Sequence, residues 1–147
     1  MSLVALLDVN LLVALFDPDH IHHDLAHNSL EDHHRKSATC PVTENGSVRV
    51  LTNPAYGATV RRPTGLVEPL GQFCSTKHHV FWADAVSLSD KRIFNRSMIR
   101  GHRQVTDVYL LGLAKKMGGC LATFDRTIPL GAVNGATRST LAVVSAT

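Results

Sequence analysis

The stretch LVALLDVN at residues 3–10 decides the fold that this sequence predicts. Its first five residues, 3–7, form a short uninterrupted apolar run, which is typical of a buried strand in a parallel sheet. Asp8 ends the run, and residues 10–16 continue as a short apolar helix that stops at an Asp-Pro pair. A strand, an acid and a helix in this order indicate the first unit of an α/β domain.

The rest of the chain repeats this alternation. We expect further strands at residues 38–42, 80–82, 120–124 and 141–144. Helical patterns lie at residues 19–35, 43–53, 64–73, 89–101 and 107–117. Strands that alternate with helices imply a mostly parallel central sheet with helices on both faces. The sequence therefore predicts one α/β domain over residues 1–147.

The composition is that of an ordinary globular protein. Hydrophobic residues make up 44% and charged residues 18%, which excludes a disordered chain, and the net charge of +3 permits a polyanionic partner without requiring one. The 3 cysteines are scattered without a Cys-x-x-Cys pair, as in buried thiols of a reducing compartment. The apolar N-terminal run has no positively charged start and is interrupted by Asp8, so we expect a cytoplasmic protein without a membrane segment.

Acidic residues follow the predicted strands. Asp8 ends the first strand and Asp125 ends the fourth, while Glu44 lies just past the second, in the first turn of a helix that Thr43 caps. The carboxyl ends of parallel strands meet at one edge of the sheet, where ligands bind in open α/β folds. The three acids are therefore expected to converge.

A fourth acid, Asp107, shares a helix face with Leu110, Leu111 and Ala114 in a helix expected to begin after Thr106. Each acid taken alone also has a structural interpretation, as a turn residue or a partner of the helix dipole. Several carboxylates at close range, however, raise one another's pKa unless a cation neutralises them. A hard cation such as Mg²⁺ is the natural partner of the four.

In these residues the chain resembles the PIN-domain family, and within it the VapC-type toxin ribonucleases of bacterial type II toxin–antitoxin systems. The resemblance extends over nearly the whole chain. It depends on the order and spacing of LLDVN at 6–10, VTE at 42–44, NP at 53–54, QVTDVYLL at 104–111 and ATFDR at 122–126.

The resemblance implies a Mg²⁺- or Mn²⁺-dependent endoribonuclease that hydrolyses RNA phosphodiester bonds by metal-activated water, with one ion or two. It implies that the catalytic residues and metal ligands are Asp8, Glu44, Asp107 and Asp125. It also implies that the polar side chains supporting these acids are Asn10, Thr106 and Thr123. The expected partners are an RNA substrate such as tRNA or rRNA, a cognate antitoxin and a second copy of the chain, in a bacterial cytoplasm.

Basic residues precede Asp107. Arg92, Arg96 and Arg100 are spaced four residues apart and would form one stripe on the helix predicted over 89–101. Such a stripe is either an ordinary solvated face or, beside a nuclease centre, a contact for RNA phosphates. Arg61 and Arg62 are lesser candidates for the same role.

Histidines crowd residues 20–34, and His23 and His27 are spaced for a zinc pair. No His-Glu-x-x-His pattern accompanies them, so a polar or antitoxin-facing surface is the favoured interpretation.

Other functions would leave different patterns. A PIN-like RNA- or partner-binding module without activity would lack one of the four acids, and none is missing. A phosphorylated receiver domain expects a lysine after the last strand, and no lysine follows residues 141–144. A haloacid-type phosphatase begins with Asp-x-Asp, whereas Asn10 stands at the second of these positions.

Overall fold

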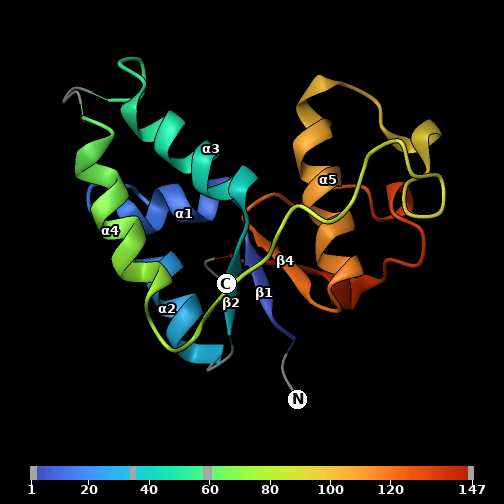
Figure 1. The fold of residues 1–147 in the computed structure, drawn as a ribbon, viewed down its shortest axis with the longest axis horizontal. Helices are drawn as coiled ribbons and strands as arrows, with labels where there is room; N and C mark the ends of the chain where they lie inside the picture. The colour runs from blue at the N-terminus through green and yellow to red at the C-terminus, as the bar shows by residue number, and fades with distance from the viewer. Residues whose placement is uncertain (1–2, 34–35, 58–60, 146–147) are drawn as a thin grey trace.

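The computed structural model describes residues 3–33, 36–57 and 61–145, and it confirms the α/β class (Figure 1). The chain runs through β1 (Ala5–Leu7), α1 (Val9–Phe16), α2 (His23–His33), β2 (Ser37–Thr39), α3 (Pro41–Thr52), α4 (Thr64–Cys74), β3 (His79–Phe81), α5 (His102–Lys116), β4 (Cys120–Thr123) and β5 (Leu141–Val143). Short 3₁₀ helices lie at Arg96–Met98, Leu130–Ala132 and Arg138–Thr140. The predicted end of the second helix near residue 35 lies outside the described residues.

The strands form one five-stranded parallel sheet in the order β3-β2-β1-β4-β5. β1 lies at its centre, where Ala5 pairs with Ser37 of β2 on one side and with Cys120 of β4 on the other. All strands therefore end at the same edge, and the residue after β1 lies beside the end of β4.

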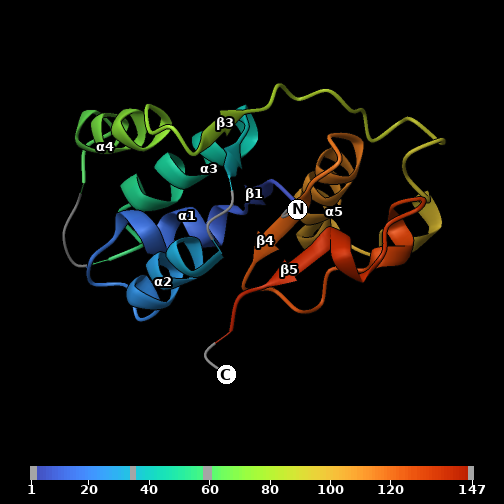
Figure 2. The same ribbon diagram turned by 90° about the horizontal axis from the view of Figure 1, so that it is seen from below.

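Alternate residues of β1 face opposite layers, as the period of two along a strand requires. Ala5 and Leu7 are buried against α1 and α2, whereas Leu6 is buried in the cluster that contains α5. Figures 1 and 2 show α1–α4 grouped on one side of β1 and β4, and α5 with the chain that precedes it on the other. The prediction of helices on both faces is confirmed.

The second strand is shorter than predicted because α3 begins early. β2 ends at Thr39, Cys40 is the N-cap of α3, and Pro41 occupies its first turn, where a missing N–H does no harm. Thr43 lies three residues past the cap, and its hydroxyl accepts a hydrogen bond from the Cys40 backbone N–H at 3.0 Å. The prediction that Thr43 is itself the cap is wrong, although it does serve the helix start.

The helix that carries Asp107 also begins earlier than predicted. α5 starts at His102 with Gly101 as its N-cap, and the Gln104 side chain accepts a hydrogen bond from the Arg100 backbone N–H at 3.0 Å. Asp107 is therefore past the first turn, and complementing the helix dipole does not explain it.

The prediction of a helix over residues 89–101 is wrong. Phe94 instead forms an antiparallel bridge with Val133, and the Asn95 backbone N–H donates to the Ala132 carbonyl at 2.9 Å. Backbone groups that a helix would pair internally are paired with residues 130–134. The buried Phe94 ring then packs so closely on α5 that a Cβ added at Gly112 would lie 2.3 Å from its Cζ.

In the described part of the chain, the helices are too short or too polar to cross a membrane.

Candidate functional site

Asp8 is the centre of the polar site at the carboxyl edge of the sheet. It follows β1, acts as the N-cap of α1 and is only 3% exposed. Its Oδ1 accepts a hydrogen bond from the Val9 backbone N–H, and its Oδ2 accepts one from the Thr123 hydroxyl, both at 2.7 Å. Burial raises the pKa of Asp8, these two hydrogen bonds oppose the rise, and the charge of Asp125 adds to it.

The hydroxyl of Thr123, at the end of β4, organises the polar groups around Asp8. It donates its one proton to Asp8 and accepts hydrogen bonds from the Asn10 amide at 3.1 Å and from the Asp125 backbone N–H at 3.0 Å. The donor and both lone pairs of this hydroxyl are therefore used. The structure brings Asn10 and Thr123 into the surroundings of Asp8 in this way.

Asp107 and Asp125 approach Asp8 from α5 and from the segment after β4. The pKa of Asp107 is raised from 3.8 to about 7, chiefly by burial and then by the charges of Asp8 and Asp125 and a side-chain interaction with Asp125. The Asp125 carboxylate is held by Thr127, whose backbone N–H and hydroxyl donate to Oδ1 at 2.8 and 2.6 Å. Three of the four predicted acids thus form one electrostatically coupled group.

An open hollow of about 1030 Å³ lies over Asp8 and Asp107. Its further lining includes Asn10, His20, Asn45, Arg49, Asn53 and Thr106. The sequence analysis missed Arg49 and His20. No prediction from the sequence pointed to Arg49, which lines the hollow one turn after Asn45 on α3.

The hydrogen bonds of the Glu44 side chain are with residues outside the group of three aspartates. The Glu44 carboxylate accepts a hydrogen bond from the Thr39 hydroxyl at 2.6 Å, and its Oε2 lies 3.7 Å from the Cys74 Sγ. His79 completes this second cluster, with its Nε2 2.7 Å from the Thr39 hydroxyl. Whether Glu44 acts together with Asp8 stays a prediction, as does the supporting role of Thr106, which lines the hollow and is exposed.

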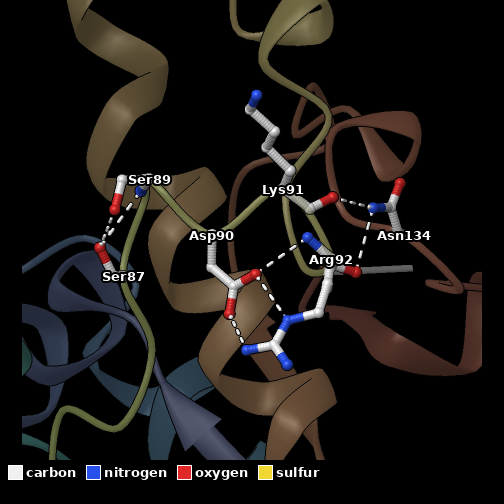
Figure 3. Close-up of polar contacts among 6 residues, drawn as sticks. All are labelled: Ser87, Ser89, Asp90, Lys91, Arg92 and Asn134. Carbon is white, nitrogen blue, oxygen red and sulfur yellow. Dashed lines mark hydrogen bonds and ion pairs between the residues drawn. The ribbon is translucent and has the colours of Figure 1, made fainter.

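The predicted basic stripe does not form, because the helix that would carry it is absent. Arg92 turns back onto Asp90, whose carboxylate accepts hydrogen bonds from its backbone N–H, Nε and Nη2 at 2.9 to 3.2 Å (Figure 3). The Asn134 amide donates to the carbonyls of Lys91 and Arg92 at 3.1 Å and holds this turn in place (Figure 3). Arg96 and Arg100, the other two members, are exposed.

The lesser basic candidate, Arg61, has a structural partner. Asp17 ends α1, is 5% exposed, and accepts hydrogen bonds from the Tyr56 hydroxyl at 2.6 Å and from Arg61 Nη2 at 3.0 Å. Burial opposes the ionised form of Asp17, but the hydrogen bonds from Tyr56 and Asp19 and the charge of Arg61 lower its pKa overall. Arg61 thus secures the loop after α3 to the end of α1, and Arg62 is exposed.

The predicted pair of histidines does lie together on α2. The rings of His23 and His27 are 4.5 Å apart, but one nitrogen of His23, Nδ1, is 2.8 Å from the Ala14 carbonyl. This contact fastens α2 to α1.

The fold and the site together define a class. A five-stranded parallel sheet with Asp8, Asp107 and Asp125 coupled at its carboxyl edge is a PIN-like α/β domain.

Comparisons with known proteins identify the family. The chain is 40% identical to ribonuclease VapC44 of Mycobacterium tuberculosis over 141 residues, which cover 95% of this chain and 99% of that protein. It is 37% identical to ribonuclease VapC39 of the same organism over 127 residues, which cover 86% of this chain and 91% of that protein. It is also 37% identical to ribonuclease VapC29 of that organism over 123 residues, which cover 84% of this chain and 86% of that protein. No family model matches the chain. With these relatives, the chain belongs to the VapC family of PIN-domain ribonucleases.

Proposed function

We propose that this chain is a metal-dependent endoribonuclease, the toxin of a toxin–antitoxin pair, whose cation is held by Asp8, Asp107 and Asp125. One observation carries the proposal. Asp8, Asp107 and Asp125 form one coupled group, in which burial and the neighbouring carboxylates raise the pKa values of Asp8 and Asp107, and an open hollow lies over Asp8 and Asp107. In the described part of the chain no cationic side chain forms an ion pair with these three carboxylates, an unfavourable arrangement that a divalent cation would relieve.

The donor set fits Mg²⁺ or Mn²⁺. Carboxylate oxygens are the ligands that such hard cations prefer, and Mg²⁺ keeps several water molecules in its coordination shell. When bound, the cation stabilises negative charge on the phosphoryl oxygens and lowers the pKa of water.

The protein's own groups prepare this site. Thr123 and the Val9 backbone N–H fix both oxygens of Asp8, so that the carboxylate is oriented before substrate arrives. Asp107, with a pKa of about 7, exchanges its proton near neutral pH. A cation and a proton therefore compete at Asp107, and we expect metal affinity to fall as the pH falls below about 7.

We assign the recognition of RNA phosphates at this site to Arg49. Its side chain lines the hollow that contains Asp8 and Asp107 and is exposed. A guanidinium donates two parallel hydrogen bonds to a phosphate and remains charged at every physiological pH. Arg96 and Arg100 are proposed as more distant contacts along the strand, whereas the pairing of Arg92 with Asp90 makes it the weakest of the three predicted contacts.

A cognate antitoxin is the proposed protein partner. A second, more apolar hollow of about 720 Å³ lies between α1, α2 and α4 and is lined by Leu15, Phe16, Leu30 and Phe73. Apolar surface of this kind marks sites where another protein binds. Self-association of the chain is a further proposal, supported by the exposed side chain of Phe81 on the edge strand β3.

The decisive experiment is RNA cleavage by the purified chain after any bound antitoxin has been removed. Total RNA is incubated with the protein in Mg²⁺, in Mn²⁺ and in chelator, and the new ends are mapped. We expect cleavage that chelator abolishes, its loss in Asp8→Asn, and its retention in Asp19→Asn, an exposed aspartate outside the site. Equal cleavage by Asp8→Asn would contradict the metal assignment, and no cleavage by the folded parent would favour a binding module instead.

A further inference from the structure

Glu44, Cys74 and His79 form a compact cluster apart from the three aspartates. They come from α3, from the last residue of α4 and from the first residue of β3. In the described part of the chain, this is the one set of at least three His, Cys, Asp or Glu side chains whose ligand atoms all lie within 4.8 Å of one another. All three side chains are half-buried, so an ion from solvent has access to them.

The spacing of these atoms suits a tetrahedral ion. With metal–ligand bonds of about 2.0–2.3 Å, the ligands of tetrahedral Zn²⁺ lie about 3.3–3.8 Å apart. The Cys74 Sγ is already 3.7 Å from the Glu44 Oε2. The third ligand atom is within 4.8 Å of both, a separation that side-chain rotation can reduce.

The Thr39 hydroxyl lies between the ligand atoms and indicates how they are oriented. It is 2.6 Å from Glu44 Oε2 and 2.7 Å from His79 Nε2, and Thr39 is 0% exposed. The ring of His79 also makes a hydrogen bond with the backbone of Cys74, which we assign to Nδ1 because Nε2 is directed at Thr39. The Thr39 hydroxyl has one proton, which it donates to Glu44, so its hydrogen bond with His79 Nε2 would be exchanged for the ion when a metal binds. A ring held at its other nitrogen by a backbone carbonyl is usual for a metal-binding histidine.

The chemistry of the donors separates this cluster from the aspartate site. A thiolate, an imidazole and a carboxylate together match Zn²⁺ and similar borderline ions, whereas Mg²⁺ takes oxygen ligands. On binding, the ion would take the place of the Cys74 thiol proton, which leaves to solvent.

We propose that Glu44, Cys74 and His79 bind a zinc-class cation and so tie α3 to the junction between α4 and β3. Three protein ligands leave a fourth position for water. None of the three aspartates takes part in this site, although Glu44 is also one of the four acids predicted for RNA cleavage.

The test uses Co²⁺ as a spectroscopic probe on the purified full-length chain, freed of metal by chelator and dialysis. A thiolate bound to Co²⁺ gives a charge-transfer band in the near ultraviolet, which oxygen ligands alone do not give. We expect the band to saturate at one ion per chain and to disappear when Zn²⁺ is added. Zn²⁺ should also raise the Tm of the metal-free protein.

Variants assign the ligands. Cys74→Ser should abolish the band and His79→Gln should weaken Co²⁺ affinity by at least about tenfold. His78→Gln changes the exposed neighbouring histidine and should leave the titration unchanged, as should Asp8→Asn. Circular dichroism of the metal-free variants checks that each is folded, and loss of Zn²⁺-dependent stabilisation in both ligand variants provides a second measurement.

The proposal is overturned by any of three results: no band in the parent protein, a band that persists in Cys74→Ser, or a band lost in Asp8→Asn. The second result would point to Cys40 or Cys120, and the third to the aspartate site. Mg²⁺-dependent RNA cleavage is measured on the same samples, so that failure of this site is distinguished from failure of the proposed nuclease.

Discussion

Replacing Asp107 by asparagine should stabilise the metal-free protein while abolishing its proposed activity. The pKa of Asp107 is raised from 3.8 to about 7 by burial and by the charges of Asp8 and Asp125, so the ionised side chain destabilises the folded state. Asparagine is nearly the same size and carries no charge. The variant therefore removes the repulsion and keeps the packing of α5.

The size of the expected stabilisation follows from the shift in the pKa of Asp107. About three pKa units at about 1.4 kcal/mol each correspond to about 4 kcal/mol for a fully shielded group. Asp107 is only half-buried, and solvent screening reduces the expected gain to about 1–2 kcal/mol. For a domain of this length, that gain corresponds to a rise in Tm of roughly 2–8 °C.

The pH dependence of the gain has a defined sign. Because the folded protein binds the Asp107 proton more tightly than the unfolded chain, the stability of the parent falls as the pH rises from 3.8 to about 7. The gain from Asp107→Asn should thus be near zero at about pH 4 and complete above pH 7.

Thermal unfolding in chelator, at about pH 4 and about pH 8, measures this difference. Glu68→Gln, which changes an exposed carboxylate on α4, is the control and should shift Tm little at either pH. Adding Mg²⁺ should then raise the Tm of the parent but not that of the variant. A destabilised Asp107→Asn protein at pH 8, or an equal gain at both pH values, would refute the account of Asp107 as a member of a repelling carboxylate group.

Three further changes test other parts of the structure. Tyr56→Phe removes the 2.6 Å hydrogen bond to Asp17 and should lower the free energy of unfolding in urea by about 1.5–3 kcal/mol at pH 7. The pKa of Asp17 is lowered in the folded protein, so the stability lost in Tyr56→Phe should become smaller as the pH falls through that pKa. A loss of stability that does not depend on pH would contradict an ionised Asp17 as the partner of Tyr56. Gly112→Ala should destabilise by about 1–3 kcal/mol in the same assay, whereas Gly71→Ala, with open space around it, should not. Arg49→Gln should raise the KM for RNA cleavage and flatten the salt dependence of RNA binding, and an unchanged salt slope would exclude it as a phosphate contact.

The sheet and the aspartate group were predictable because their signals are local. The apolar runs that became β1 and β4 are each followed closely by an acid, and parallel strands bring such acids to one edge. Asp107 was predictable from the apolar face that it shares with Leu110 and Leu111, both 0% exposed.

The errors arose where distant partners determine the local structure. Residues 89–101 have a helical spacing of arginines, but their backbone pairs with residues 130–134, which no local pattern indicates. Glu44 was predicted at the strand edge by the same reasoning as Asp8. Its side chain contacts Cys74, which is 30 residues away in the sequence and which no local pattern indicates, and its role beside Asp8 stays a prediction. The position of an acid just after a strand predicts at which edge of the sheet it lies. For an acid on a helix, such as Glu44, it does not predict the direction in which the side chain points.

Buried threonines at the strand ends help to determine where these acidic side chains point. Thr39 ends β2 and Thr123 ends β4, and both are 0% exposed. Each must donate its hydroxyl proton inside the protein, because an unpaired buried hydroxyl is unfavourable by about 1–3 kcal/mol. Each donates to an acid, Thr39 to Glu44 at 2.6 Å and Thr123 to Asp8 at 2.7 Å. The two acids are thus held by different threonines, and the side chain of Glu44 also lies beside the sulfur of Cys74.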